Sequence, residues 1–287
     1  MLDIEDIERK VDELPLLPEV VVRLLRLNHN DENFFDQVLE LAQQDPTFAL
    51  QVIKLSNSAS SAPLHQISSL QEAVARVGAE AIAGLITSMA VLRVFVPSTQ
   101  GEKDLWVHSF QVALAAKRLV HLNPSLKLDA NQAYLCGLMH DIGRFVVFDK
   151  AAKELQKVEE ENWHTPEQLI DAEEHIYGFN HAKLGAKVCV KWGLPDLVRR
   201  IVGYHHLYGV KHQQTIFEHS KEMGYLLQII QLADRISVHL MHEENKDANE
   251  CLHPSLNLIH LNTDSLEHLL NEIERESQSL VNALGLG

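Results

Sequence analysis

The sequence predicts an all-α fold for this chain of 287 residues. Apolar residues recur at helical spacing along nearly its whole length, whereas alternating runs bounded by turn residues are hard to find. Hydrophobic residues make up 46% of the chain, which is normal for a globular protein with a sizeable core. The length suits one large domain or two moderate ones. We therefore expect a multi-helix architecture.

The first helices are predicted from prolines that interrupt an otherwise apolar pattern. Leu-Pro-Leu-Leu-Pro at 14–18 indicates an extended entry to a helix of about three turns that ends near Leu27. A second helix is expected over 33–44. The pair Asp45-Pro46 should end it and open a third helix, because proline is well placed at the first helical position. The small polar residues 56–63 then predict a turn.

The next helices are predicted from a cap and a break. Ser69 and Glu72 have the spacing of a capping box, which marks the start of a helix. Gly78 should separate this helix from an apolar one over 79–96. Residues 97–101, rich in turn-forming types, make the best linker candidate in the chain, so we place a subdomain boundary there.

The remaining helices follow from apolar stripes at helical spacing. They are expected over 105–120, 130–148, 166–174, 181–192, 195–204 and 225–241, with an amphipathic helix starting near Asp264. That last helix could pack on its own domain or dock a partner. We therefore divide the chain into an N-terminal subdomain (1–100), a helical core (101–245) and a C-terminal extension (246–287).

Composition excludes several protein classes. The longest uncharged apolar stretch, 81–92, is shorter than the roughly 20 residues that span a bilayer. The acidic N-terminus lacks the features of a secretory signal, so we expect a cytoplasmic protein with no membrane partner. A net charge of −15 opposes nucleic-acid binding. Cys136, Cys189 and Cys251 are widely separated, which predicts reduced thiols and neither disulfides nor a thiolate zinc site.

The stretch GLMHDIGR, residues 137–144, contains an adjacent His140 and Asp141 on an apolar segment. Chance alone supplies about one His-Asp pair in a chain with 17 histidines, so the pair needs support from elsewhere. Several other ligand-type residues are also flanked by apolar positions. They are His108, His181, His205, His206 and Asp234.

Adjacent residues on a helix diverge by about 100°, so a His-Asp pair can serve two metal ions at once. Imidazole and carboxylate together suit Fe, Mn, Zn, Co or Ni. Two such ions could activate water and hold the oxygens of a phosphoryl displacement. The alternative is structural: taken singly, His108 or His181 is more often a hydrogen-bonded helix histidine, and Asp234 an ion-pair partner of Arg235.

The ordered motifs resemble a known family. LWVHSF, LMHDIGR, FNHAKLGA, YHH and LAD look like the ligand series of the HD superfamily of metal-dependent phosphohydrolases. LPLLPEVVVRLLRL, AQQDPTFALQVIKLSNSA and ISSLQEAVARVGAEAI are similar to the N-terminal signature of the HDOD family, the HD-related output domains of bacterial signalling. The resemblance covers about residues 14–238. It implies an all-helical, cytoplasmic, regulatory module.

The resemblance also implies site residues and a cofactor. His108, His140, Asp141 and Asp234 match general HD ligand positions, and His181, His205 and His206 match extra histidines of dinuclear HD-GYP relatives. We expect one or two divalent transition-metal ions, with Fe or Mn favoured over Zn or Ni. Asp141 and Arg144 are the candidate catalytic residues, Arg144 as a phosphate contact in the place of the usual lysine. The Gly-Tyr-Pro motif of cyclic-di-GMP phosphodiesterases is absent after His206, which argues against that activity.

Three functions follow from these observations. The preferred one is a metal-binding signalling regulator with a signalling-protein partner. The second is an active metal-dependent phosphohydrolase that acts on a phosphate ester or nucleotide. The third is a metal-free scaffold for protein interaction, in which the site is a relic. Metal content, turnover of phosphorylated substrates and metal-independent partner binding separate the three.

Overall fold

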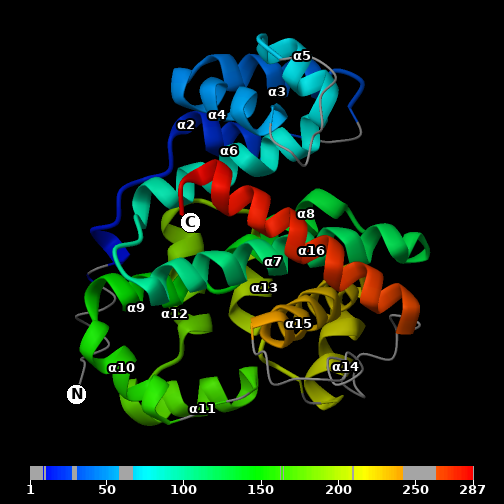
Figure 1. Ribbon diagram of the computed structural model, residues 1–287. Coiled ribbons are helices and arrows are strands. Elements are labelled where there is room, and N and C mark those ends of the chain that lie inside the picture. The colour runs from blue at the N-terminus through cyan, green and yellow to red at the C-terminus, as the bar shows by residue number, and fades with distance from the viewer. Residues whose placement is uncertain are drawn as a thin grey trace. The chain divides into compact units, whose positions relative to one another are not determined.

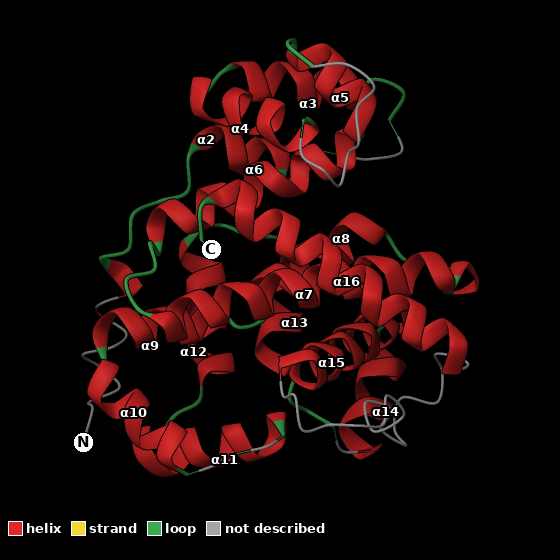
Figure 2. Cartoon of the chain, in the orientation of Figure 1, coloured by secondary structure: helices red, strands yellow, loops and turns green. Residues whose placement is uncertain are grey.

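The computed structural model describes residues 9, 11–27, 31–57, 67–161, 163, 165–208, 210–241 and 263–286. Within these ranges the regular elements are helices and none is a strand, which confirms the all-α prediction (Figures 1 and 2). The chain divides into two compact units. We call Pro15–Lys103 with Arg275–Gly287 the N-terminal unit, and Met1–Leu14 with Asp104–Glu274 the central unit.

The N-terminal unit is built from short helices around an apolar core. These are α2 (Glu19–Leu24), α3 (Phe34–Gln43), α4 (Pro46–Ser56), α5 (Leu70–Val77) and α6 (Ala79–Val94). The predicted helix starts are confirmed at two caps. The Asp45 carboxylate accepts a hydrogen bond from the Thr47 N–H at 2.8 Å, and the Ser69 hydroxyl accepts one from the Glu72 N–H at 3.1 Å.

Two predicted boundaries in this unit were wrong. Helix α2 ends at Leu24, earlier than expected, because the N–H groups of Arg26 and Leu27 bond to carbonyls only three residues back, the tighter pattern that ends many helices. Helix α6 ends at Val94, before the predicted Val96. The turn expected over 56–63 lies mostly outside the described residues.

Gly78 separates α5 from α6, as predicted. Its φ of 93° lies in the left-handed region that glycine tolerates, and the two helices are bent by 109° about this break. Among the described residues, no single helix combines the length and the hydropathy needed to cross a membrane, and α5 with α6 meet that criterion only as this bent pair.

The central unit contains the helices that follow along the chain, and the first of them belongs to it from Asp104 on. They are α7 (Gln100–Leu122), the short 3-10 helix η1 (Pro124–Leu126), α8 (Ala130–Met139), α9 (Ile142–Lys150), α10 (Ala152–Glu160), α11 (Pro166–Tyr177), α12 (His181–Lys191), α13 (Asp196–Tyr204), α14 (Val210–His219) and α15 (Lys221–Met241). Helices α10 and α14 were not predicted. The last helix, α16 (Thr263–Leu284), begins one residue before the predicted start, and its residues from Arg275 on group with the N-terminal unit.

Helix α7 begins at Gln100, inside the predicted linker. The Glu102 carboxylate accepts hydrogen bonds from the N–H groups of Ser98 and Thr99, while the Thr99 hydroxyl accepts one from the Glu102 N–H. This reciprocal arrangement is a capping box, so the helix starts at the cap although its first turn is polar.

The helix predicted over 130–148 is interrupted at its middle. Met139 ends α8, Ile142 begins α9, and Asp141 lies between them with φ −98° and ψ 16°. Beyond the break, α9 packs very closely on α12: a methyl group in place of the Gly143 hydrogen would lie 2.0 Å from the carbonyl oxygen of His181. The expectation that His140 and Asp141 diverge along one continuous helix was therefore wrong.

The two cysteines that the structure describes are buried, which confirms their predicted place in the core, and they are not bonded to each other. Cys136 lies in α8 and Cys189 in α12. Burial raises the pKa of the Cys136 thiol well above its usual value, to beyond the physiological range, so this thiol stays protonated. Cys251 lies outside the described residues.

Candidate metal centre

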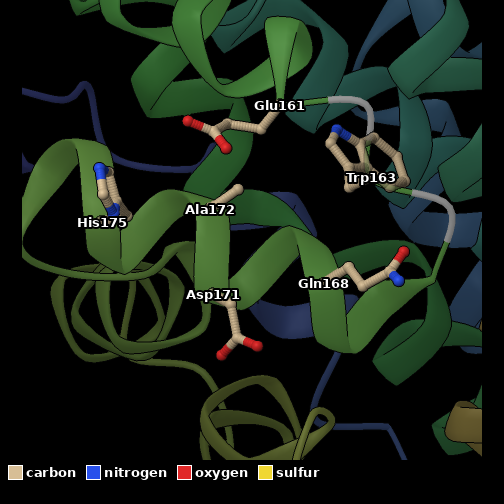
Figure 3. Close-up of a pocket in the computed structure, with 6 residues that line it drawn as sticks. All are labelled: Glu161, Trp163, Gln168, Asp171, Ala172 and His175. Atoms are coloured by element: carbon tan, nitrogen blue, oxygen red, sulfur yellow. The ribbon is translucent and has the colours of Figure 1, made fainter.

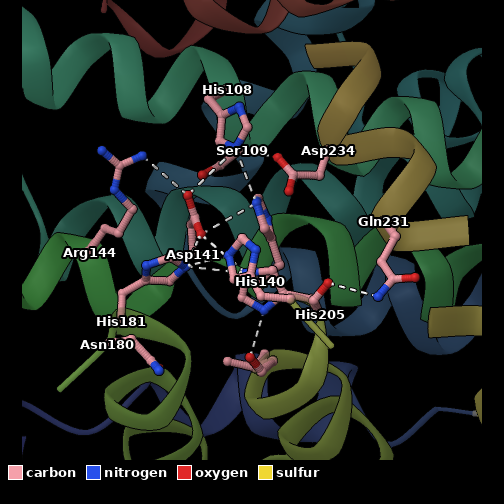
Figure 4. A network of polar contacts seen from close by, with 12 residues as sticks. His108, Ser109, His140, Asp141, Arg144, Asn180, His181, His205, Gln231 and Asp234 are labelled. Carbon is pink, nitrogen blue, oxygen red and sulfur yellow. Dashed lines mark hydrogen bonds and ion pairs between the residues drawn. The ribbon is translucent and has the colours of Figure 1, made fainter. Parts of the chain in front are cut away.

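Ligand-type side chains from separate helices meet inside the central unit (Figure 4). The structure brings together all seven residues that the sequence singled out as candidate ligands. They are His108 in α7, His140 and Asp141 between α8 and α9, His181 as the first residue of α12, His205 and His206 directly after α13, and Asp234 in α15. Most of them occupy helix ends. All are buried except His206, which is partly buried.

The Asp141 carboxylate lies at the middle of this cluster. Its Oδ1 is 2.9 Å from Nε2 of His181 and 3.5 Å from Nε2 of both His140 and His205. Its Oδ2 is 3.5 Å from Nε2 of His108. One carboxylate therefore reaches imidazoles from several directions, which is the arrangement of a bridging ligand.

Among the described residues, the potential ligand atoms form two groups. Within each group, all of these atoms lie within 4.8 Å of one another. One group contains Asp141, His181, His205 and His206, and the other contains His108, His140 and Asp234. With Asp141 between them, the geometry suits either one ion or a pair.

The Nδ1 atoms of two histidines donate to carbonyl groups of their own helices. His140 Nδ1 lies 2.7 Å from the Gly137 oxygen, and His205 Nδ1 lies 2.7 Å from the Val202 oxygen. Since a carbonyl can only accept, the hydrogen of each neutral imidazole is on Nδ1 and the lone pair is on Nε2. Both lone pairs face the cluster.

Two side-chain hydrogen bonds give His108 the same tautomer, with its hydrogen on Nδ1. The Ser237 hydroxyl donates to Oε1 of Gln111 at 2.7 Å, so its oxygen accepts from Nδ1 of His108 at 2.8 Å. The Nε2 lone pair of His108 consequently faces Nε2 of His140, only 3.1 Å away. Two lone pairs at this distance repel unless a cation lies beside them.

His181 is held between two carboxylates. Its Nδ1 donates to Oε2 of Glu173 at 2.6 Å, and the same oxygen accepts its backbone N–H at 2.8 Å. Burial opposes a charge here, but Glu173 and Asp141 outweigh it and raise the pKa of His181 to about 10. A proton on Nε2 then points at Asp141, where a metal ion would otherwise bind.

The pKa values of the two aspartates of the cluster are shifted in opposite directions. Burial and the nearby negative charge of Asp141 raise the pKa of Asp234 to about 8. Burial disfavours the charge on Asp141 as well, but His140 and His181 lower its pKa well below the usual value. Oδ2 of Asp234 is buried and has no hydrogen-bond partner. A buried carboxylate whose oxygen lacks a hydrogen-bond partner is stabilised when a cation takes the place of its proton.

The residues therefore fit a divalent metal ion. The Nδ1 atoms of His108, His140, His181 and His205 are engaged by outer hydrogen bonds, as is usual for metal-binding histidines, and their Nε2 atoms face carboxylate oxygens or one another. The buried Nδ1 of His206 has no hydrogen-bond partner. The donors are nitrogen and oxygen only, which suits first-row transition metals.

Arg144, the predicted phosphate contact, borders the cluster. Its Nη1 is 3.5 Å from Oδ2 of Asp141, and its guanidinium lies over the ring of Trp163 at 5.5 Å from the centroid. Arg235, the expected partner of Asp234, instead forms an ion pair with Glu167 and lies over the Tyr208 ring at 4.9 Å.

Sequence reasoning missed the residues that orient the ligands. Glu173 and Ser237 anchor His181 and His108, and Gln231 donates to the carbonyls of His205 and Leu207, which holds the turn after α13. Glu173 could have been singled out from the sequence, because it is an acidic residue on the apolar stripe of its helix, between Leu169 and Tyr177.

The family model for the HDOD domain matches residues 14–208, which include most of this cluster. The chain belongs to the HDOD family. This HDOD chain is 28% identical over 201 residues to an uncharacterized protein of Treponema pallidum, an alignment that covers 69% of the chain. It spans only 38% of the length of that relative.

Solved structures show the same fold. An HDOD domain protein of unknown function from Geobacter sulfurreducens matches with a TM-score of 0.72 and 23% identity over 98% of both chains. A protein from Shewanella amazonensis named "Putative phosphohydrolase" matches with a TM-score of 0.70 and 21% identity over 97% of both chains. At these identities the matches establish that this HDOD chain shares their fold.

Proposed function

We propose that this HDOD protein is a cytoplasmic signal-transduction protein that binds one or two divalent metal ions at the cluster around Asp141. One observation carries the proposal: the Nδ1 atoms of His108, His140 and His205 are engaged by acceptors, so their Nε2 lone pairs converge in a buried space around one carboxylate. Such a concentration of lone pairs calls for a cation.

The proposed ions are iron or manganese, within the range of first-row transition metals that the donor atoms suit. Imidazole and carboxylate groups bind these ions well, and neither described cysteine belongs to the two ligand groups, as a thiolate site would require. The two groups, one of which contains Asp141 while its Oδ2 also lies near His108 of the other, are compatible with one ion or with two. A signalling-protein partner and a cytoplasmic location belong to the proposal through the family.

Metal analysis of protein purified without chelator tests this function. We expect one or two equivalents of bound transition metal, and a loss of most of it in His108→Ala and in Asp141→Ala. His121→Ala is the matched control, because His121 is an exposed histidine on the same helix as His108. Wild-type protein that stays metal-free after incubation with Fe²⁺ and Mn²⁺ would contradict the proposal.

A second candidate function, metal-dependent phosphohydrolysis, is favoured by Arg144. Its buried guanidinium lies beside Asp141 and provides a fork of donors that matches two phosphate oxygens. Metal ions at this site would supply Lewis-acid stabilisation of the phosphate oxygens. Arg144 would orient the phosphate, and Asp141 would keep the ligand cluster assembled. The missing Gly-Tyr-Pro motif makes a cyclic dinucleotide the least suited substrate.

A substrate screen tests the second function. With Mn²⁺ or Fe²⁺ added, we expect turnover of a phosphate ester or nucleotide that disappears in Asp141→Asn. Arg144→Lys should retain metal but raise KM, because lysine keeps the charge and loses the fork. Turnover that is unchanged in Asp141→Asn would assign the activity to a contaminant.

A further inference from the structure

A pocket of about 350 Å³ lies on α11, outside the ligand cluster but next to Arg144 (Figure 3). Its described lining residues come from the segment between α10 and α11 and from α11 itself. They are Glu161, Trp163, Gln168, Asp171, Ala172 and His175. In Figure 3, Glu161, Trp163 and His175 surround the methyl group of Ala172, whereas Asp171 points away from them. The volume is within the range of small-molecule sites.

Trp163 gives this pocket a flat, partly exposed aromatic wall. The other two tryptophans of the chain, Trp106 and Trp192, are 1% and 3% exposed and belong to the core. The indole of Trp163 and the small side chain of Ala172 line the same pocket, whose volume is large enough for a planar ring. Stacking of a base on such a ring contributes measurably to binding whatever the base.

The polar groups of the pocket suit the edge of a base. The Gln168 amide offers both a donor and an acceptor, and the Glu161 carboxylate accepts from amino groups. Carboxylates recognise exocyclic amino groups such as that of cytosine. The same carboxylate repels a phosphate, so an anionic ligand would not place its charged end here.

Arg144 supplies the complementary end. Its guanidinium contacts Trp163 on one side and the Asp141 carboxylate of the ligand cluster on the other. A single side chain therefore separates the aromatic wall from the candidate metal centre. The pocket is acidic and aromatic, whereas Arg144, beside the candidate metal ligands, is cationic.

We propose that the Trp163 pocket is a base-binding subsite, and that the ligand of this protein is a nucleotide whose amino-bearing base stacks on Trp163 while its phosphate reaches Arg144. The part of this inference that concerns the phosphate rests on the proposed function, because Arg144 borders the proposed metal centre. The base end depends only on residues outside that centre.

Binding measurements on the full-length, metal-loaded protein test this inference. Tryptophan fluorescence should report base stacking directly, because only Trp163 among the three tryptophans is accessible. Cytidine and cytidine 5′-monophosphate should quench the emission, whereas ribose 5-phosphate and inorganic phosphate should not. Calorimetry should show that the nucleotide binds at least about tenfold more tightly than ribose 5-phosphate.

Variants separate stacking from edge recognition. Trp163→Ala should weaken cytidine monophosphate binding at least about fivefold, while Trp163→Phe should retain most of it because phenylalanine also stacks. Glu161→Gln should reduce the preference for cytidine over uridine. Glu160→Gln is its matched control, since this exposed neighbour does not line the pocket. Metal content measured on every variant shows that the fold and the centre persist.

The outcomes distinguish the base subsite from the metal centre. If the protein stays metal-free after incubation with Fe²⁺ and Mn²⁺ and nucleosides still quench Trp163, the subsite would be supported and the metal proposal overturned. Bound metal with equal affinity for ribose 5-phosphate and cytidine monophosphate would overturn the subsite alone. Undiminished nucleotide binding by a folded Trp163→Ala variant would also overturn it.

Discussion

The two units of this protein bury polar side chains in opposite ways. In the N-terminal unit, the hydroxyls of Ser56, Thr87 and Ser88 donate to carbonyls four residues back in their own helices, at 2.7–2.9 Å. In the central unit, His140 and His205 satisfy one ring nitrogen in this local way and leave the other facing the cluster. These hydroxyls of the first unit form hydrogen bonds within their own helices, whereas the second unit concentrates imidazole nitrogens that have no such local partner at one point.

A further contact shows how self-contained the N-terminal unit is. The Asn57 side chain accepts from the Ile67 N–H at 2.8 Å and donates to the Ile67 carbonyl at 2.7 Å. One amide thus satisfies both polar groups of a backbone position ten residues away. No external ligand is needed there, whereas the histidine cluster would gain stability from the proposed metal ion.

Metal addition should produce the largest difference in stability between the two units. A metal ion present at a hundredfold excess over its Kd raises the free energy of unfolding by about 3 kcal/mol, because it binds the folded state alone. Hydrogen exchange measured with metal and with chelator should show this protection in α8, α12 and α13. The helices α3 and α4 should exchange equally in both conditions. Equal exchange everywhere would remove the proposed difference between the units.

Gly143→Ala should damage the central unit by steric conflict. The added methyl would lie 2.0 Å from the His181 oxygen and 2.7 Å from the Gly185 nitrogen, so α9 and α12 would have to separate. We expect a loss of about 2–3 kcal/mol in unfolding free energy and weaker metal binding.

Gly203→Ala is the matched control for this clash. A methyl there meets only the Ala186 methyl at 3.5 Å, an ordinary contact. Because alanine favours helices over glycine, this variant should be neutral or more stable by up to about 1 kcal/mol. Urea denaturation compares the two variants. Equal stability would show that the close approach of α9 and α12 is unimportant.

Glu173→Gln should test the orientation of His181 with a smaller change. The variant weakens the acceptor for Nδ1, so metal affinity should fall about tenfold to a hundredfold. Glu174→Gln provides the control, because Glu174 is exposed and contacts Lys183 and Asn180 rather than the His181 ring. Competition with a metal indicator dye measures both. Identical affinities in the two variants would show that Glu173 does not tune the site.

The smallest effect is expected from Asp45 in the N-terminal unit. The Arg93 guanidinium is the main cause that lowers the pKa of Asp45 to about 2, and the Thr47 N–H contributes. A lowered folded-state pKa stabilises the protein above the unfolded value near 4, and this contribution is lost as the pH falls toward 2. Arg93 is 38% exposed, so solvent screening limits the contribution to about 1 kcal/mol.

Asp45→Asn measures this contribution by urea unfolding at two pH values. The variant should be less stable than the wild-type protein at pH 7, and the difference should shrink as the pH approaches 2. Its metal content should stay unchanged, because the cluster lies in the other unit. A stability difference that grows in acid would contradict the assigned direction.

Much of the fold was predictable because helix starts depend on neighbouring residues. Asp45-Pro46 and the Ser69 cap act within three positions, and the structure confirms both. The cap at Thr99 and Glu102 had the same spacing and was overlooked because the surrounding residues resemble a linker. The break at Asp141 was not readable from spacing, since the apolar pattern continues across it.

The sequence by itself determined the types of ligand and their order along the chain, from His108 to Asp234. The tertiary structure decided which atoms of those residues face one another. His108 is oriented by Ser237, 129 positions away, and His181 by Glu173 on another helix. Such contacts depend on how helices pack, because hydrogen bonds between distant residues form only after their helices have met.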